Sequence, residues 1–171
     1  MNTTLVQIVR EEMKPDGALR DIYIEGVSLA DWDRFLTWIT TRGGTYGFAA
    51  SGSETWSPEM PTASILFSPD REDLPGLLFL KAGGGDLCCH FFCAGEIELD
   101  LDPKDFQCDA NIQALLGFMQ SIGDLLRKDV LFCYENWKNA LIVTYSPEMQ
   151  SFHHRQKSEQ SDAGNRAEPG A

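Results

Sequence analysis

Three strand-length segments separated by short turns lie between residues 76 and 103, and they leave the chain few folds other than an antiparallel meander. The first two, Gly76–Ala82 and Leu87–Cys93, are apolar. Gly83-Gly84-Gly85-Asp86 joins them, and its glycines supply the positive φ angles that a hairpin turn requires. The next element is a strand, and no lysine-serine or lysine-threonine pair follows these glycines, so they are a turn and not a phosphate-binding loop.

The third segment, EIELDLDP at residues 96–103, alternates acidic and apolar residues. Successive side chains of a strand point to opposite faces, so the apolar side chains are expected to pack on a helix while the carboxylates face outward. At a rise of about 3.3 Å per residue, the outward side chains form a row about 20 Å long. We refer to this set as the acidic row: Glu96, Glu98, Asp100 and Asp102.

Two interpretations of the acidic row stand at this point. Like charges in a row repel one another, and a basic protein partner would relieve that repulsion. Alternation alone also predicts polar residues on the wet face of an antiparallel strand. A calcium site is less consistent, because calcium loops gather oxygens on a tight turn and not along a straight strand.

Two amphipathic helices are predicted to cover the sheet. Ser28 and Asp31 form a capping box, and the apolar stripe that follows ends at Gly43-Gly44. Asp109 is predicted to cap a long helix that runs to about Lys128. The apolar stripes of these helices are Leu29, Trp32, Phe35, Leu36 and Ile39, and Ile112, Leu115, Leu116, Met119, Ile122 and Leu126.

The remaining segments complete a single α+β domain over residues 1–150, with a mainly antiparallel sheet. The order is α, β, α, β and then a β-β-β-α-β-β core. The further predicted elements are a short helix at Thr4–Lys14, strands at Asp21–Val27 and Thr45–Ala50, a loop over Ser51–Pro75 with a helical turn near Ala63–Phe67, and a hairpin of Val130–Tyr134 and Ala140–Tyr145.

Residues 151–171 are predicted to form a disordered, dispensable tail. From His153 onward the chain has no aliphatic residue larger than alanine, so it buries too little apolar surface to offset the entropy of ordering. His153 and His154 are interpreted as solvated residues and not as metal ligands.

Length and cysteine usage indicate one soluble domain in a reducing cytoplasm. A chain of 171 residues, 43% hydrophobic, has enough apolar residues for one core. No basic region precedes a hydrophobic segment at the start of the chain, and the apolar runs are of strand length, so we expect no cleaved signal and no membrane span. Five cysteines without CxxC spacing favour free thiols.

The formal charge of −12 belongs entirely to the domain, because the charges from Ser151 onward cancel. A surface of this sign repels nucleic-acid phosphates and anionic lipids, and it steers a basic protein toward the chain. Acidic charge also keeps proteins soluble, which is the simpler explanation.

No catalytic, metal or cofactor motif stands out. His90 is the single imidazole before the tail, and strand alternation places Cys88 on its face. The pair is the basis of a distant enzyme alternative, although free cysteines on a strand are more often core residues, and we expect Cys89 and Phe91 to be buried. Zinc ligands normally occur in closely spaced pairs on turns, which this strand lacks.

Two tryptophans outside the predicted core are candidate contacts for a partner. Trp137 lies at a predicted hairpin tip and Trp56 in a loop, and exposed tryptophans often anchor interfaces.

Three stretches of the chain resemble a group of small acidic uncharacterised bacterial proteins. They are LRDIYIEGVSLADWDRFLTWI, LCCHFFCAGEIELDLDPKDF and YENWKNALIVTYSPE, within residues 19–148. More loosely, the chain is similar in kind to immunity proteins that neutralise bacterial toxins with carboxylates, and its β-β-β-α-β-β order is that of type III secretion chaperones.

The leading functional hypothesis is a non-enzymatic, immunity-type protein that binds a basic partner. Its predicted contacts are Glu96, Glu98, Asp100, Asp102 and Trp137. The alternatives are a chaperone for a secreted effector and, more distantly, an enzyme that uses Cys88 and His90.

Overall fold

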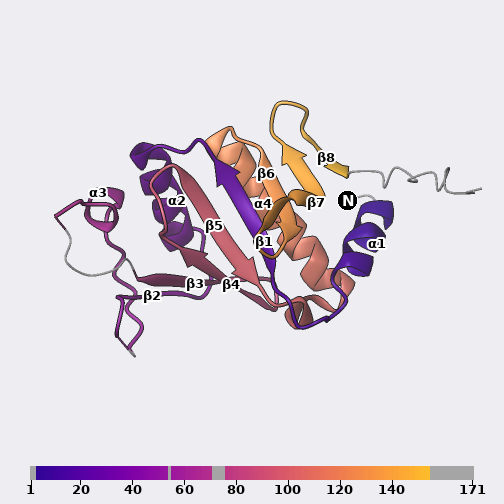
Figure 1. The fold of residues 1–171 in the computed structure, drawn as a ribbon, viewed down its shortest axis with the longest axis horizontal. Helices are drawn as coiled ribbons and strands as arrows, with labels where there is room; N and C mark the ends of the chain where they lie inside the picture. The colour runs from indigo at the N-terminus through magenta and orange to yellow at the C-terminus, as the bar shows by residue number, and fades with distance from the viewer. Residues whose placement is uncertain (1–2, 54, 71–75, 155–171) are drawn as a thin grey trace, which may run out of the picture.

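The computed structural model describes residues 3–53, 55–70 and 76–154. Within them it contains one eight-stranded sheet, four α-helices and one 3₁₀ helix (Figure 1). The strands are β1 Arg20–Glu25, β2 Tyr46–Ala49, β3 Leu77–Ala82, β4 Gly85–His90, β5 Glu96–Leu101, β6 Val130–Tyr134, β7 Trp137–Ser146 and β8 Ser151–His154. The helices are α1 Thr3–Glu12, α2 Leu29–Thr41, α3 Ala63–Leu66, η1 Pro103–Phe106 and α4 Asp109–Leu126.

Every paired strand in the sheet is antiparallel, in the order β2-β3-β4-β5-β1-β6-β7-β8. The predicted α+β class is therefore confirmed. β3, β4 and β5 form the meander, and β6 and β7 form the hairpin. The first strand of the chain, β1, lies between these two groups and pairs with both β5 and β6.

Helices α2 and α4 cover one face of the sheet and leave the other face open (Figure 1). Ile97, Leu99 and Leu101 of β5 are buried on the helix side, together with Ile22 and Ile24 of β1. We call the opposite side of the sheet the open face. Because side chains alternate along a strand, the residues between these apolar positions point to the open face.

The start of α2 agrees in detail with the sequence. The Ser28 side chain accepts a hydrogen bond from the Asp31 backbone N–H at 3.2 Å, and the Asp31 carboxylate accepts one from the Ser28 N–H at 2.9 Å. Trp32 on the apolar stripe is fully buried, and its indole N–H donates to the Ala94 carbonyl at 3.1 Å. The capping box therefore both begins the helix and sets its contact with the turn before β5.

Several boundaries differ from the prediction; β7, for example, begins at Trp137 and not at Ala140. Asp109 is the first residue of α4, and the capping position belongs to Cys108, whose side chain makes no capping hydrogen bond. Strand β4 ends at His90 and not at Cys93, because its pairing with β5 ends at His90 opposite Glu98. Beyond that pair Phe91 turns into the core, as expected of a buried residue, whereas the next residue, Phe92, is 72% exposed.

The predicted disorder of the C-terminal segment is wrong for Ser151–His154, which form β8 against β7. Gln150, with a φ of 51°, reverses the chain after β7, and the Phe152 ring then packs on Tyr145 at 5.0 Å between centroids. The prediction considered aliphatic residues and overlooked the apolar area of one phenylalanine. Residues 155–171 of the predicted tail, and residues 54 and 71–75 of the predicted loop, lie outside the described residues.

The last strand gives a test by truncation. A chain that ends at Gln150 loses β8 and the Phe152 contact, so we expect its free energy of unfolding to fall by about 2 kcal/mol, the scale of one buried aromatic side chain. A chain that ends at His154 keeps both and is the matched control. Equal thermal melting temperatures for the two truncated chains would show that β8 contributes no stability.

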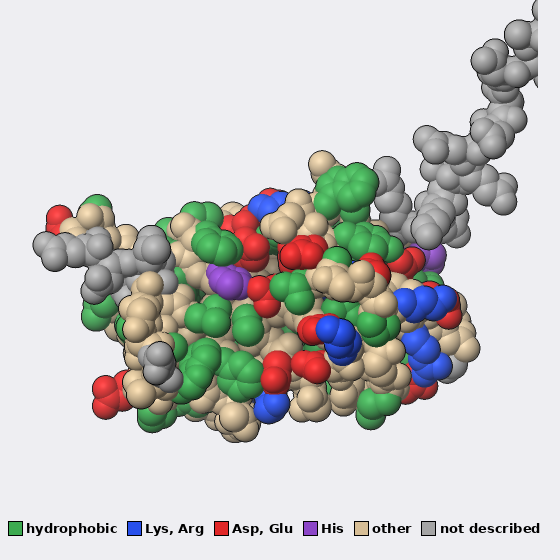
Figure 2. All heavy atoms as spheres, turned by 60° about the horizontal axis from the view of Figure 1, so that its bottom comes forward, with side chains coloured by type: hydrophobic (Ala, Val, Ile, Leu, Met, Phe, Trp, Pro, Cys, Tyr) green, Lys and Arg blue, Asp and Glu red, His purple; other side chains and the backbone are tan. Residues whose placement is uncertain are grey.

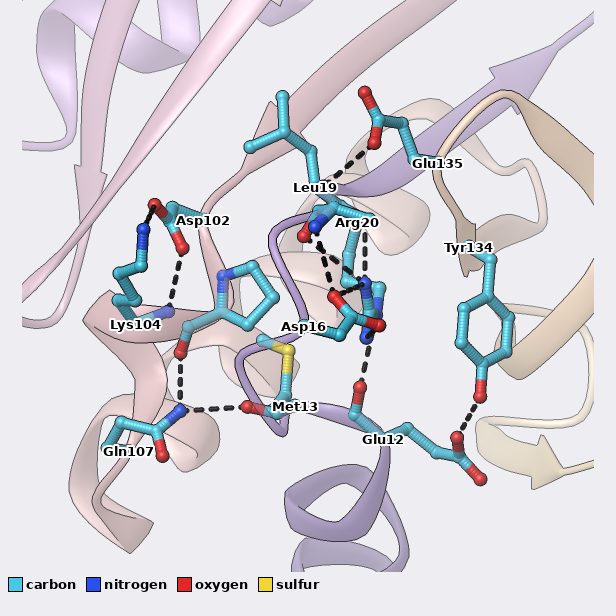
Figure 3. Close-up of polar contacts among 12 residues, drawn as sticks. Glu12, Met13, Asp16, Leu19, Arg20, Asp102, Lys104, Gln107, Tyr134 and Glu135 are labelled. Carbon is cyan, nitrogen blue, oxygen red and sulfur yellow. Dashed lines mark hydrogen bonds and ion pairs between the residues drawn. The ribbon is translucent and has the colours of Figure 1, made fainter.

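A buried arginine anchors the N-terminal helix to the centre of the sheet (Figure 3). Arg20, the first residue of β1, is only 2% exposed. Its guanidinium donates to the Glu12 carbonyl at 3.0 Å, the Leu19 carbonyl at 2.9 Å and the Asp16 carboxylate at 3.0 Å. It also lies 4.8 Å from the centre of the Tyr134 ring, whose hydroxyl donates to the Glu12 carboxylate. One side chain thus joins α1, β1 and β6.

Replacing Arg20 tests this anchor. Arg20→Ala removes a buried guanidinium and leaves several partly buried acceptors without their donor, so we expect a loss of about 3 kcal/mol in unfolding free energy. Arg34→Ala is the control, because Arg34 is half exposed and pairs with Asp31 within one helix turn, an arrangement that contributes less than about 1 kcal/mol. Urea unfolding of both variants measures the difference, and similar losses would contradict the anchor role.

Candidate functional site

Acidic side chains from two adjacent strands meet in the middle of the open face. The register pairs Glu25 with Glu96 and Tyr23 with Glu98, and it pairs Asp21 with Asp100. His90 of β4 lies opposite Glu98 on the other side. In Figure 2, carboxylates, hydrophobic side chains and a histidine intermingle on one surface. We refer to this set as the acidic face: Asp21, Tyr23, Glu25, His90, Glu96, Glu98 and Asp100.

The acidic row is divided by the structure. Glu96, Glu98 and Asp100 point to the open face, as the alternation predicted. Asp102 lies beyond β5 and caps η1, where its carboxylate accepts a hydrogen bond from the Lys104 backbone N–H at 2.9 Å. That hydrogen bond, together with the Lys104 side chain, holds the pKa of Asp102 below its usual value despite slight burial. Asp102 therefore serves the local turn.

Asp100 is neutralised from the neighbouring strand. Its carboxylate lies 2.6 Å from His90 Nε2, and the two side chains are 23% and 28% exposed. The hydrogen bond to Asp100 raises the pKa of His90, against the opposing effect of burial. The Phe92 ring stacks on the imidazole at 4.8 Å and 3°, so the ion pair is shielded by an exposed aromatic ring.

Glu98 lies at the centre of the acidic face and has the weakest compensation. Its closest polar contact is the Tyr23 hydroxyl at 3.4 Å, which donates more closely to Asp21 at 2.8 Å. Burial raises the pKa of Glu98, and the charges of Asp21 and Glu96 raise it further. Within the part of the chain that the structure describes, no lysine or arginine forms an ion pair with Glu98.

Asp21 is a buried carboxylate beside Glu98. It is only 3% exposed, and it accepts hydrogen bonds from the Asn136 backbone N–H at 2.7 Å and from the Tyr23 hydroxyl. Burial raises its pKa, because these two donors only partly replace water. Proximity to Asp21 accordingly favours the neutral form of any carboxyl group next to it.

Glu96 is neutralised by a lysine from the far hairpin. Lys138 of β7 contacts the Glu96 carboxylate, lies 3.4 Å from Glu25 and stands 4.6 Å from the centre of the Tyr23 ring. Burial opposes the charge of Lys138, but the two carboxylates outweigh it and raise its pKa. The acidic face therefore already holds one ammonium group of its own chain.

Trp137 does not lie on the acidic face. It pairs across the hairpin with Tyr134, whose hydroxyl bonds Glu12 of α1, so alternation along β7 points Trp137 and Lys138 to opposite sides. Trp137 is 64% exposed. The structure thus separates it from the acidic row, although Trp137 directly precedes Lys138 in the chain.

The residues that sequence reasoning missed are Asp21, Glu25 and Lys138. The alternation in DIYIE gave a signal that Asp21, Tyr23 and Glu25 share one face of a strand. Nothing local indicated that this strand lies next to β5, or that Lys138 crosses β6 to reach both.

The Cys88 and His90 pair has the wrong electrostatics for a thiolate nucleophile. Both side chains are on the open face of β4, but His90 Nε2 is engaged by Asp100. Burial and the carboxylates of Asp100 and Asp86 raise the pKa of Cys88 to about 11, whereas an activated thiol has a lowered pKa. Among the residues that the structure describes, no three histidine, cysteine or acidic side chains are grouped as metal ligands.

Comparisons with known proteins identify no relative of this chain. No family model, curated protein or solved structure matches the chain, so its resemblance to small acidic bacterial proteins stays a prediction. Of the helices described, none has the length and apolarity to cross a bilayer.

The ion pair of His90 and Asp100 predicts a pH-dependent contribution to stability. Since the folded state raises the pKa of His90, the pair stabilises the fold fully below the unfolded value of about 6.5 and loses this effect as pH rises through the folded value. Asp100→Asn is therefore expected to lower the pKa of His90 and to destabilise the fold more in mild acid than in alkali.

An NMR titration of the His90 ring measures the change in its pKa, and thermal melts from mild acid to alkali measure the change in stability. Asp86→Asn removes a nearby carboxylate that pairs with Lys81 and serves as the control. An unchanged His90 pKa in Asp100→Asn would contradict the assignment.

Proposed function

We propose that this chain is a non-enzymatic, immunity-type binding protein whose acidic face takes up basic side chains of a protein partner such as a bacterial toxin. The observation that carries the proposal is the excess of negative charge at one place on the sheet. Asp21, Glu25, Glu96, Glu98 and Asp100 gather there, and the cationic groups in contact with them are Lys138 and His90.

Glu98 is the centre of this excess. Its neighbours disfavour its charge, so a lysine or arginine of a partner would gain a carboxylate and relieve a repulsion at the same time. The same potential would accelerate the encounter with a basic protein and repel phosphates. Cationic protein side chains are therefore the ligand class that this face fits.

The contacts of Lys138 support this choice of ligand, because they place a cation of the chain itself on the acidic face. Its ammonium sits between two carboxylates and a tyrosine ring, which is a favourable site for a lysine because cation–π and ionic attraction act together. In the proposed complex, a partner's cation competes with Lys138 for Glu96 and Glu25. In the free protein, Lys138 reduces the repulsion among the carboxylates of the acidic face.

Exposed aromatic rings favour the chaperone alternative. Phe92 stacks over His90, and Trp56, 52% exposed, packs on Phe79 of β3 at 5.7 Å. Phe79 lies opposite Cys88 in the register, so these rings share the open face with the carboxylates. A secreted effector segment with apolar side chains would use them, and gene neighbourhood separates the two functions: a toxin-like reading frame supports immunity, and an effector supports a chaperone.

The acidic face is tested by charge reversal against the protein encoded beside this gene. Glu98→Lys should slow association by about tenfold or more and weaken its salt dependence, because charge accelerates mainly the encounter. Lys138→Met should speed association, since it removes the internal competitor. Biosensor kinetics at several salt concentrations give both results, and co-expression rescue applies if the neighbour is toxic.

Glu148→Lys is the matched control, because it makes the same charge change at an exposed position in the turn between β7 and β8. Circular dichroism checks that each variant folds. Glu98→Lys should retain the fold, since it removes the repulsion of Glu98 by Asp21 and Glu96. If Glu98→Lys and Glu148→Lys associate at the same rate, the acidic face is an ordinary wet face of a strand.

A further inference from the structure

The outermost strand of the sheet on the C-terminal side has one neighbour. β8 pairs with β7 from Ser151 to His154, and no other described strand pairs with its outer side. An edge strand presents backbone N–H and C=O groups that another strand can bind. This edge lies at the end of the sheet next to α1 (Figure 1).

A hollow adjoins this edge. It has a volume of about 500 Å³ and lies between α1, α4 and β8, with apolar side chains from Leu5, Ile8 and Phe152. None of the residues that line it is an aspartate, glutamate, lysine or arginine, although the chain carries a net charge of −12. The acid nearby, Asp124, accepts hydrogen bonds from the Tyr145 hydroxyl at 2.7 Å and from Gln150 at 3.2 Å.

We propose that two copies of the chain associate through this end, with their β8 strands paired antiparallel about a two-fold axis. Two identical acidic chains repel each other over most of their surface, so they can approach only where the surface lacks net charge. The lining of the hollow meets that condition, because His154 is its one titratable side chain and it contains no acid. A basic partner, in contrast, would find no carboxylate there and would bind the acidic face.

The symmetry of the pairing also favours a second copy. In a two-fold interface the same patch serves both partners, and an antiparallel pair of β8 strands needs no further sequence to be self-complementary. Pairing would cover the exposed edge and bring α1 of each copy beside β8 of the other, which closes both hollows. The sheet would then continue from one copy into the next.

This inference is independent of the proposed function. The acidic face belongs to β1, β4 and β5 in the middle of the sheet, and the dimer would form at the β8 end. Both acidic faces would stay accessible, so the dimer would bind two partners.

The test is the mass of the full chain in solution by sedimentation velocity over a range of micromolar concentrations. We expect the wild type to sediment as a dimer, at twice the chain mass of 19.1 kDa. Ile8→Glu places a like charge in each hollow and should weaken the dimer by about tenfold or more. Gln7→Glu, exposed on the same helix but outside the lining, is the matched control.

Gln120→Glu on α4 repeats the test from another helix in case Ile8→Glu unfolds α1, which circular dichroism detects. A monomeric wild type, or a dimer that is equally stable in Gln7→Glu, Ile8→Glu and Gln120→Glu, would overturn the proposal. So would a wild-type monomer that becomes a dimer when the chain ends at His154, because the occupant of the hollow would then be the chain's own C-terminal segment.

Discussion

The pairing of β1 with both β5 and β6 is the constraint on which the other features depend. It joins the meander of β3, β4 and β5 to the hairpin of β6 and β7, and without it the sheet would divide into two parts, each with only a few strands. Those parts would be β2-β3-β4-β5 and β6-β7-β8, held together only through the helices. The apolar side of β1 completes a continuous layer under α2 and α4, with Ile22 and Ile24 fully buried.

The same strand concentrates unfavourable charge on the open face. Asp21, Tyr23 and Glu25 come from β1. The register against β5 places Asp21 opposite Asp100 and Glu25 opposite Glu96, on either side of the pair formed by Tyr23 and Glu98. The fold tolerates this because Lys138 engages both Glu25 and Glu96, while His90 and the Asn136 backbone N–H each engage one further carboxylate. Glu98 is the carboxylate without such a contact, so a cation of a partner would stabilise the protein most at this position. If the proposed function holds, stability and recognition depend on the same few side chains.

Local patterns in the sequence predicted most elements, because each depends on nearby residues. Ser28 and Asp31 define a helix start within one turn, and the alternation in EIELDLDP defines which side of β5 is buried. The Asp109 cap was assigned one residue too late, because Cys108 occupies the capping position without a capping side chain. β8 was missed because its stability comes from pairing with β7 and from a single ring on Tyr145.

The candidate site was predictable only in part, for a physical reason. The direction of Glu96, Glu98 and Asp100 follows from alternation within one strand. Their counter-ions come from elsewhere: Lys138 is 42 residues from Glu96, and its approach depends on register shifts in the pairing of β6 with β7. Such irregularities change which face a side chain reaches, so no local pattern marks Lys138 as a site residue. Trp137 is predicted as a contact only because it lies near a hairpin tip.

The central place of the first strand also determines when this protein becomes complete during synthesis. Asp21 receives its hydrogen bond from Asn136, 115 residues later in the chain, so β1 has one free edge until the ribosome has released most of the domain. Contacts of this sequence separation form slowly, and an apolar strand with an unpaired edge is prone to mispairing in the meantime. Charged and polar side chains on one side of β1 would keep the waiting strand solvated, so the acids of the open face would also protect the nascent chain from aggregation.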